Sequence, residues 1–534
     1  MRSLPTMSIR WGLGIAVTLG LIACGYYLTW DWDKSLLGMH FFRQTQTAIT
    51  AYCFIHEGFT FNYQTPVLGK PWAIPFELPL YQFLAALVTE ISQIDLDRAG
   101  RLVSVVFWLG CLFPLVKILH WWVEDPILRW AVVLLIGSSP TYIYWSDSFM
   151  MESTALFFSL MYLYTLVQST RQASTVFALL AMLCGLMAGL QKATTFLIAL
   201  VPAVAFAGLV LYRRPGRPLD RVFWKNIVQI FIAVAVPMTA VALWTRHADA
   251  VKTLNPLGRN FVTSHALTAW NFGTMAQRES FSVWDRIGTI ESIWGFGRGS
   301  SLLLLAAILV LPVAIVWSRY RMEILILIAA YLTGPLVFTN LFFIHEYYNY
   351  ENSLYLNLAF GLAVIGLVEA FVPKAASVKP QKKKKKEGPP VLKVAISSAI
   401  LLVVSGWGIW TYSDTFSSFI AKLPTSEQAR QVLLPVAKAG NPQDVLLIYG
   451  LDWDPTVAYY SGRKAIMDRE GRRLDDPAVA ESLSNLSPGQ GIAAMIVTGP
   501  LAQNAAFIHE RVNRFHLSTT PIMIPWGQCY LKAP

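Results

Sequence analysis

Ionisable and aromatic side chains gather in short stretches between the long apolar runs of this sequence. The stretch SDSFMMES, positions 146–153, places Asp147 and Glu152 between two such runs. Ionisable groups at the edge of a hydrocarbon layer are costly, and by default they indicate a functional site. The candidate site residues are the acids Asp33, Glu77, Asp147 and Glu152, the polar or cationic residues His40, Arg43, Gln44, Lys192 and His345, and the tyrosines Tyr347 and Tyr348.

The chemistry suited to this mixture is group transfer from a lipid phosphate. The donor would be a sugar on a polyprenyl phosphate, with its tail in the bilayer and its phosphate at headgroup depth. A cation would hold the phosphate and stabilise the charge on the departing group. A carboxylate would take the proton from an incoming hydroxyl, and aromatic rings would stack on the sugar. The four acids are therefore candidate catalytic residues, and the other residues are candidate ligands of the donor.

Each residue taken singly has a simpler interpretation. Lys192 could snorkel to the membrane surface, Tyr347 and Tyr348 could anchor the aromatic belt, and Asp147 could cap a helix. Because all of them are expected at one membrane depth, we favour the functional interpretation.

The composition is typical of a polytopic membrane protein. Of the 534 residues, 55% are hydrophobic and 14% are charged, whereas soluble domains carry about 25% charged residues. The net charge of +11 comes from basic residues in short connectors between apolar runs. That distribution indicates membrane orientation and argues against a nucleic-acid partner.

The five cysteines show no spacing typical of a metal site. Cys24, Cys111 and Cys184 lie in apolar runs, where cysteine behaves as a small hydrophobic residue. A disulfide between Cys53 and Cys529 is weakly supported, because connectivity cannot be read from a sequence.

Eleven apolar runs are long enough to be candidate membrane spans. They are 11–29, 102–119, 128–145, 153–169, 175–191, 193–212, 226–245, 300–317, 322–343, 353–372 and 392–412. The first lacks a small-residue cleavage site and is expected to be retained as a span. The shorter run 79–91 is expected to form a juxtamembrane helix that does not cross the membrane.

The distribution of basic residues predicts the topology. With the N-terminus in the cytoplasm, basic connectors such as 213–225, with Arg217, and 373–391, with Lys382 to Lys386, also face the cytoplasm, as the positive-inside rule requires. The outer side then receives the connectors 146–152 and 341–352 and two long loops, 30–101 and 246–299. The second long loop carries arginines that include Arg298. We expect a multi-pass protein of the bacterial inner membrane, in contact with its lipids.

The polarity of the chain changes near residue 412. Residues 1–412 are expected to form the membrane domain, and residues 413–534 a small α/β domain outside the membrane. DVLLIYG and GIAAMIVTG read as strands, and DPAVAESLSNL and LAQNAAFIHERVNRF as helices. No G-x-G-x-x-G follows the first strand, so no nucleotide cofactor is expected. Asp452 and Asp454 are interpreted as cap or turn residues, and a divalent metal is left open.

The order of several motifs resembles the GT-C superfamily of polyprenyl-phosphate-dependent glycosyltransferases, in particular its protein O-mannosyltransferase and aminoarabinose transferase branch. The motifs are FRQTQTA, IPFELPLYQFLAAL and AGRLVSV in the first outer loop, then ESTALFF with Glu152, GLQKATT with Lys192, and HEYYNYENSLYLN. The resemblance covers roughly residues 11–372. It implies a juxtamembrane helix after the first span, catalysis on the outer face, and inversion at the anomeric carbon.

The chain departs from this family in its first outer loop. Arg43 and Gln44 occupy the positions at which the family carries the acid regarded as its catalytic base. Glu77, Asp33 and Glu152 are the alternative bases, and Glu77 is favoured because Pro75 and Pro79 flank it. Arg43 and His40 would then bind phosphate. The change is also compatible with an inactive or differently specialised homologue.

The leading hypothesis is sugar transfer to an external acceptor, which could be a lipid, a glycan or a protein. A transporter or flippase of lipid-linked sugars is the alternative from another class. That class predicts charges deep within the spans and broken helices at the midplane, whereas the ionisable groups here gather at span ends. A polysaccharide polymerase or ligase is a second enzymatic alternative.

Overall fold

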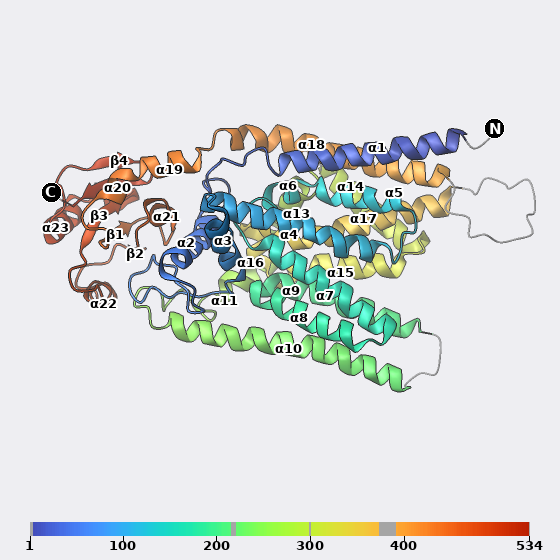
Figure 1. The fold of residues 1–534 in the computed structure, drawn as a ribbon, viewed down its shortest axis with the longest axis horizontal. Helices are drawn as coiled ribbons and strands as arrows, with labels where there is room; N and C mark the ends of the chain where they lie inside the picture. The colour runs from blue at the N-terminus through green and yellow to red at the C-terminus, as the bar shows by residue number, and fades with distance from the viewer. Residues whose placement is uncertain (1–3, 215–219, 298–300, 373–390, 533–534) are drawn as a thin grey trace, which may run out of the picture.

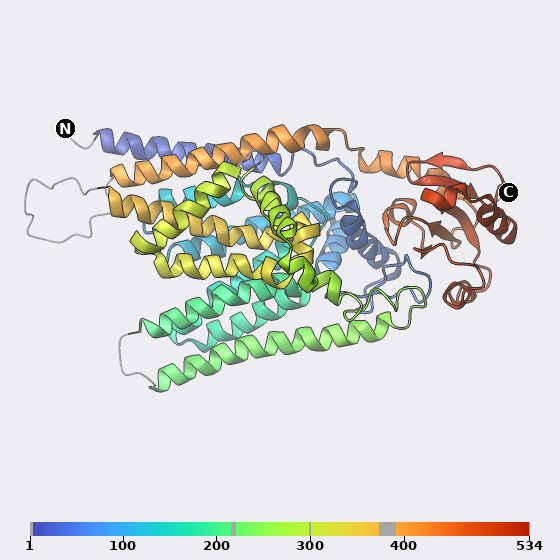
Figure 2. The same cartoon turned by 180° about the vertical axis from the view of Figure 1, so that it is seen from behind.

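The computed structural model of the chain describes residues 4–214, 220–297, 301–372 and 391–532. Long helices form a bundle, and a five-stranded sheet with several short helices stands at one end of it (Figure 1). Seen from behind, the long helices run roughly along one axis (Figure 2). This architecture confirms the expected fold class, an α-helical membrane bundle with a small C-terminal α/β part.

The apolar runs form the helices of the bundle. These helices are α1 (Leu4–Tyr27), α4 (Leu96–Leu119), α5 (Pro126–Gly137), α6 (Pro140–Trp145), α7 (Glu152–Gln172), α8 (Thr175–Gln191), α9 (Ala193–Tyr212), α10 (Arg221–Lys252), α14 (Ser301–Trp317), α15 (Arg321–Val337), α16 (Thr339–Ile344), α17 (Asn349–Phe371) and α18 (Val391–Ala421). Among the described residues, six helices are long and apolar enough to cross a membrane, judged by length and composition. The figure of eleven spans therefore stays a prediction.

Two expected spans are each broken into two helices. The run 128–145 forms α5 and α6, because Pro140 has no backbone N–H and Ser139 before it takes an extended conformation. The run 322–343 forms α15 and α16, with the break at Phe338. Both breaks place a short helix toward the end of the bundle that carries the sheet (Figure 1).

The ends of the helices follow the alternation expected from the charge distribution. The start of α1, the end of α9, the start of α10, the end of α17 and the start of α18 all lie at the end of the bundle away from the sheet (Figures 1 and 2). Arg217, Arg298 and the run Lys382 to Lys386 lie outside the described residues. Which compartment each end faces remains a prediction.

The segments expected on the outer side contain helices of their own. These are α2 (Phe41–Glu57), α3 (Leu80–Ser92), α11 (Thr268–Phe272), α12 (Met275–Glu279), α13 (Phe281–Gly295) and the 3-10 turn η1 (Glu346–Tyr348). The helix α3 lies where the juxtamembrane helix was expected. The helix α2 was not foreseen, because the polar stretch RQTQT at its start hides the apolar period. This helix begins after His40, whose φ of 49° is left-handed and turns the chain into it.

The C-terminal part forms one mixed sheet. Its elements are α19 (Ser426–Val432), α20 (Leu434–Lys438), β1 (Val445–Tyr449), α21 (Thr456–Ser461), β2 (Ala465–Asp468), α22 (Pro477–Ser484), β3 (Ile492–Val497), η2 (Gly499–Gln503), α23 (Ala505–Phe515), β4 (Ile522–Ile524) and β5 (Gly527–Leu531). The strand order is β2-β1-β3-β5-β4, in which β1 is parallel to β2 and β3, and β5 is antiparallel to β3 and β4.

The expected strands and helices of this part appear as β1, β3, α22 and α23. The short strands β2, β4 and β5 were missed, because three to five residues give too little alternation to recognise. Asp454 accepts a hydrogen bond from the Thr456 backbone N–H at 2.9 Å, as expected of a cap or turn residue. Asp452 has a φ of 54° and pairs with Arg469.

The cysteine prediction is settled by the described residues, which include all five cysteines. Each is a free thiol, so the weakly supported disulfide between Cys53 and Cys529 is not formed. Both residues are buried, and Cys529 packs in the hydrophobic core of the sheet as a small hydrophobic side chain.

The first outer loop completes the edge of the C-terminal sheet. The backbone N–H groups of Ala465 and Met467 on β2 donate to the carbonyls of Pro66 and Val67 at 2.9 and 3.0 Å. Unpaired strand edges leave backbone groups unsatisfied. The loop therefore satisfies the edge of β2 and joins the sheet to the bundle.

A buried carboxylate forms a second joint between the bundle and the sheet. Asp97, in the first turn of α4, is fully buried. It accepts hydrogen bonds from Ser426 at 2.6 Å, from Tyr460 at 3.0 Å and from Tyr459. A buried carboxylate is stable only when its oxygens are satisfied in this way, so the C-terminal part is held to the bundle at this point.

We predict that Asp97→Ala weakens this joint by roughly 3 kcal/mol, because buried hydroxyls lose a charged acceptor. Limited proteolysis should then cut the segment between α18 and β1 faster than in the wild type. Asp33→Ala is the matched control, since Asp33 is 65% exposed and pairs with the exposed Arg98. Equal proteolysis of the wild type and Asp97→Ala would contradict the assignment.

Candidate functional site

The segment that carries Glu77 is irregular and is held in place by groups from other elements. Pro75 and Pro79 flank it, and proline disfavours helix in the residues just before it. The backbone N–H of Phe76 donates to the Tyr63 hydroxyl at 2.7 Å, and the Trp244 indole donates to the Phe76 carbonyl at 2.9 Å. These contacts fix the position of Glu77.

The same segment is joined to the break between α8 and α9. The Leu78 N–H donates to the Leu190 carbonyl at 2.8 Å, and the Gln191 side chain donates to the Leu78 carbonyl at 3.1 Å. Gln191 also accepts from the Thr154 hydroxyl at 2.7 Å. The next residue is Lys192, whose extended backbone separates α8 from α9. Glu77 and Lys192 are therefore placed by one shared set of hydrogen bonds.

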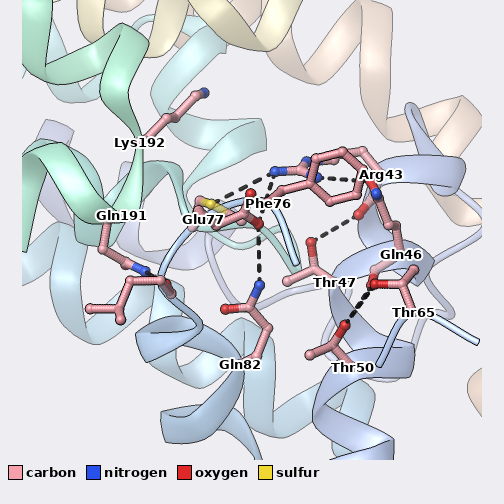
Figure 3. A network of polar contacts seen from close by, with 12 residues as sticks. Arg43, Gln46, Thr47, Thr50, Thr65, Phe76, Glu77, Gln82, Gln191 and Lys192 are labelled. Carbon is pink, nitrogen blue, oxygen red and sulfur yellow. Dashed lines mark hydrogen bonds and ion pairs between the residues drawn. The ribbon is translucent and has the colours of Figure 1, made fainter. Parts of the chain in front are cut away.

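Arg43 reaches from α2 to Glu77 (Figure 3). Its guanidinium donates to the Glu77 carboxylate at 3.2 Å and to Gln46 at 2.8 Å, and it lies 3.8 Å from the sulfur of Met151. Gln82 donates to the same Glu77 oxygen at 3.3 Å. The pair is half-buried, with 24% of Arg43 and 13% of Glu77 exposed, so a ligand can reach both groups.

Lys192 forms a more deeply buried ion pair with Glu152. Its ammonium lies 2.5 Å from the Glu152 carboxylate and over the rings of Tyr348 and Tyr347, 4.4 and 5.2 Å from their centroids. Burial lowers the pKa of Lys192, against the opposing attraction of Glu152. The second Glu152 oxygen is buried and has no partner among the described residues. This carboxylate can therefore hold Lys192 and still accept another donor.

Histidines and aromatic rings form the adjoining wall. His40 lies 2.5 Å from Glu346, and its ring centroid lies 5.0 Å from that of His345 and 4.9 Å from that of Tyr347. His345 stacks on Tyr347 at 5.2 Å. Burial, reinforced by the neighbouring His40, lowers the pKa of His345 to about 3. Its buried Nδ1 has no partner among the described residues.

Asp147 and Asp33 lie in other surroundings. Asp147 is buried beside Arg101, which lies 3.4 Å from both Asp147 and Asp31. Burial and the neighbouring Asp31 raise the pKa of Asp147, and Arg101 opposes that shift. Asp33 is exposed and pairs with Arg98 at 2.5 Å. Neither acid has a direct contact with Glu77 or Lys192 among the described residues.

Gln44 is buried and holds the backbone. Its amide donates to the Met39 carbonyl at 2.9 Å, and its oxygen accepts from the Phe149 N–H at 3.1 Å. Gln44 therefore ties α2 to the turn that leads into α7. Both of its polar ends are occupied by the backbone, unlike those of its neighbour Arg43.

The structure thus brings together most of the residues singled out from the sequence. Two sets of contacts lie close together, the pair Arg43–Glu77 and the set of Glu152, Lys192, His40, His345, Tyr347 and Tyr348. The hydrogen bonds of Leu78 to the end of α8 hold the two sets side by side, within electrostatic reach of each other, and together they are hereafter called the outer cluster. Sequence reasoning missed Gln46, Gln82 and Gln191. Gln46 lies one helical turn after Arg43, so it was missed together with the helix α2. Gln191 could have been found because it directly precedes Lys192.

An open apolar groove adjoins the outer cluster. It has a volume of about 730 Å³ and is lined by Phe61, Leu190, Leu243 and Trp244, among others. Leu190 and Trp244 are the residues that hydrogen-bond the segment around Glu77. The groove therefore lies between residues 60–62, the end of α8 and the second half of α10, beside the residues that position Glu77.

Metal-binding groups are sparse in the described part of the chain. Within it, no set of three or more His, Cys, Asp or Glu side chains is arranged to hold a metal ion.

Comparisons with known proteins relate the fold to solved structures. No protein-family model matches the chain, and no curated protein matches it by sequence. ArnT from Cupriavidus metallidurans bound to undecaprenyl phosphate matches with a TM-score of 0.58 and 12% identity, over 97% of this chain and 99% of that one. The apo state of ArnT matches with a TM-score of 0.58 and 13% identity, over 99% of this chain and 100% of that one.

A second protein has a related fold. The archaeal oligosaccharyltransferase AglB from Archaeoglobus fulgidus, in complex with an inhibitory peptide and a dolichol-phosphate, matches with a TM-score of 0.50 and 11% identity. The match covers 98% of this chain and 74% of AglB. The chain therefore shares its fold with ArnT and with AglB.

The buried state of His345 predicts a loss of stability in mild acid. Below about pH 6.5 an unfolded histidine takes up a proton, whereas the folded His345 does so only near pH 3. The contribution of the neutral His345 to the free energy of unfolding is therefore complete above about pH 6.5. It falls as the pH falls, and roughly 2 kcal/mol is lost at pH 5. His345→Gln should reduce the drop in thermal unfolding midpoint between pH 7 and pH 5 in detergent.

The control for this measurement is His509→Gln, which replaces an exposed histidine on α23. It should leave the drop unchanged. If His345→Gln and the wild type lose the same stability on acidification, His345 is not the group responsible.

Proposed function

We propose that this protein is a membrane glycosyltransferase that moves a sugar from a polyprenyl-phosphate-linked donor to an acceptor outside the cytoplasm. The observation that carries the proposal is the proximity of two ion pairs, Arg43–Glu77 and Lys192–Glu152, which the hydrogen bonds of Leu78 hold side by side near an apolar groove. The shared fold with ArnT, solved with undecaprenyl phosphate, supports a donor of this kind.

In this proposal Lys192 and Arg43 hold the donor phosphate, and the polyprenyl tail lies in the groove along α8 and α10. The bond between the anomeric carbon and the phosphate oxygen breaks, and that oxygen keeps the electron pair. The two cations stabilise the resulting charge, which is greatest as the bond breaks. The released product is the polyprenyl phosphate.

Glu77 is the proposed general base. It takes the proton from the acceptor hydroxyl, whose oxygen bonds to the anomeric carbon with inversion. In the free protein Arg43 and Gln82 donate hydrogen bonds to this carboxylate and orient it. When a phosphate draws Arg43 toward itself, Glu77 becomes free to accept a proton.

Glu152 is assigned a positioning role. Its carboxylate is buried and lies 2.5 Å from Lys192, so it holds the ammonium toward the site and offsets the cost of burying it. The rings of His40, His345 and Tyr347 form the wall on which the sugar would stack. Asp147, Asp33 and Gln44 take no direct part in this mechanism.

The sequence hypotheses on location and acceptor are carried into the proposal. The N-terminus faces the cytoplasm of a bacterium, and the outer cluster and the sheet face away from it. The acceptor is a lipid, a glycan or a protein. A flippase of lipid-linked sugars, or a polymerase or ligase, would give other outcomes in the experiments below.

We predict that Glu77→Gln and Lys192→Ala each reduce transfer by about 10²–10⁴-fold, because each removes a group that acts on the reacting atoms. The change is measured as release of polyprenyl phosphate from donor by purified protein in detergent with envelope extract as acceptor. Asp33→Asn, on an exposed acid of the same loop, is the control. Full activity of both site variants would exclude the assignment.

Mass spectrometry of envelope lipids, glycans and proteins tests the function itself. Cells that lack the gene should lose one sugar modification, and cells that carry Glu77→Gln should lose the same one. If the protein is a flippase, cells that carry Glu77→Gln should keep the modification. If it is a polymerase or ligase, loss of the gene should change the length of a glycan chain in place of removing a single sugar.

A further inference from the structure

A hollow of about 400 Å³ lies at the end of the bundle away from the sheet. It is lined by the turn after α4, by the ends of α7 and α9 with the residues that follow them, and by the starts of α10 and α15. The helix α7 begins at Glu152, in the outer cluster, and carries Arg171 in its last turn. At 1.5 Å per residue the hollow lies about 29 Å from the cluster, so it is a separate feature.

The hollow presents cations that are only partly occupied. The Arg171 guanidinium lies 4.4 Å from the centroid of the Trp121 ring and has no carboxylate partner among the described residues. Arg213 donates to Glu323 at 2.6 Å through one nitrogen. Arg214, in contrast, forms two hydrogen bonds to Asp220. Arg171 and Arg213 can therefore receive an anion such as phosphate.

The hollow also presents an unsatisfied acceptor. Glu323 is 4% exposed, and its Oε2 has no hydrogen-bond partner among the described residues. A buried carboxylate oxygen without a donor is unfavourable. The missing partner must be an N–H or O–H donor, and a cationic donor would suit the charge best.

The remaining lining is apolar and aromatic. Val167, Phe206 and Leu209 line it between the helices, with Trp121 and Trp122 beside them. Tryptophan at a span end is typical of the membrane interface. The hollow thus combines a site for a phosphate, a site for an ammonium and an apolar wall at headgroup depth.

We propose that this hollow binds the headgroup of a phospholipid that carries a primary ammonium, of the phosphatidylethanolamine class. The phosphate is held by Arg171 and Arg213, and the ammonium donates to Oε2 of Glu323. The acyl chains lie along the apolar lining, as in other basic pockets between membrane helices. This site is independent of the proposed transferase activity.

The chemistry predicts which lipids compete. Phosphatidylcholine has the same phosphate, but its quaternary ammonium has no N–H to donate. Phosphatidylglycerol has the phosphate and no cation. Loss of one charge-assisted hydrogen bond costs about 1.5–3 kcal/mol, which is roughly tenfold or more in affinity. Phosphatidylethanolamine should therefore bind at least about tenfold more tightly than either.

The test is native mass spectrometry of the delipidated full-length protein in detergent, titrated with each of these lipids and with free phosphoethanolamine. We expect selective retention of phosphatidylethanolamine and little retention of the free headgroup. Equal retention of the three lipids would overturn the proposal. Binding of phosphoethanolamine as tight as that of the lipid would overturn the assignment to a lipid.

Two variants locate the site. Glu323→Gln should abolish the preference for phosphatidylethanolamine over phosphatidylcholine, and Arg171→Gln should weaken all phospholipids by about tenfold. Arg171 is exposed, so its replacement should not impair folding. The control is Lys117→Gln, on an exposed lysine at the same end of α4. Unchanged selectivity in Glu323→Gln, unchanged affinity in Arg171→Gln, or either effect in the control, would overturn the proposal.

Discussion

The hydrogen bonds that join Leu78 to the end of α8 are the constraint on which the outer cluster depends. Prolines on both sides disfavour helix in the Glu77 segment, so its backbone groups need partners from elsewhere. Leu190 and Gln191 supply those partners, and the next residue is Lys192. The acid and the cation come from segments more than a hundred positions apart, and they are positioned by the same few contacts. The pairing of their side chains with Arg43 and Glu152 then offsets the cost of burying four charges.

Much of the bundle could be predicted from the sequence because a membrane helix leaves a strong signal. Apolar runs coincide with helices, and the helix ends alternate as the basic connectors indicate. The break at Pro140 was missed because apolar residues continue through it, and hydropathy does not register a lost backbone donor. The helix α2 was missed for the opposite reason, since it is buried against protein and carries threonines and glutamines on its packed face.

The sequence predicts the end of the bundle at which the candidate residues lie, but it does not predict which of them contact one another. Charge and run length place Asp147, Glu152 and Glu77 at the same end of the bundle. Charge and run length cannot distinguish an acid that pairs with a buried arginine, as Asp147 does with Arg101, from an acid that faces a ligand. That distinction depends on contacts between distant segments. The role of Gln44 likewise depends on Phe149, more than a hundred residues away.

The pairing of β2 with the first outer loop has a consequence for how the protein is made. Pro66 and Val67 leave the ribosome about 400 residues before their partners on β2, which at roughly 5–20 residues per second is a delay of about 20–80 s. During that interval the loop has neither its hydrogen-bond partners nor the strand that covers it. Maturation of the outer end must therefore wait for the last part of the chain, and a truncated nascent protein would be recognisable to quality-control proteases by this uncovered loop.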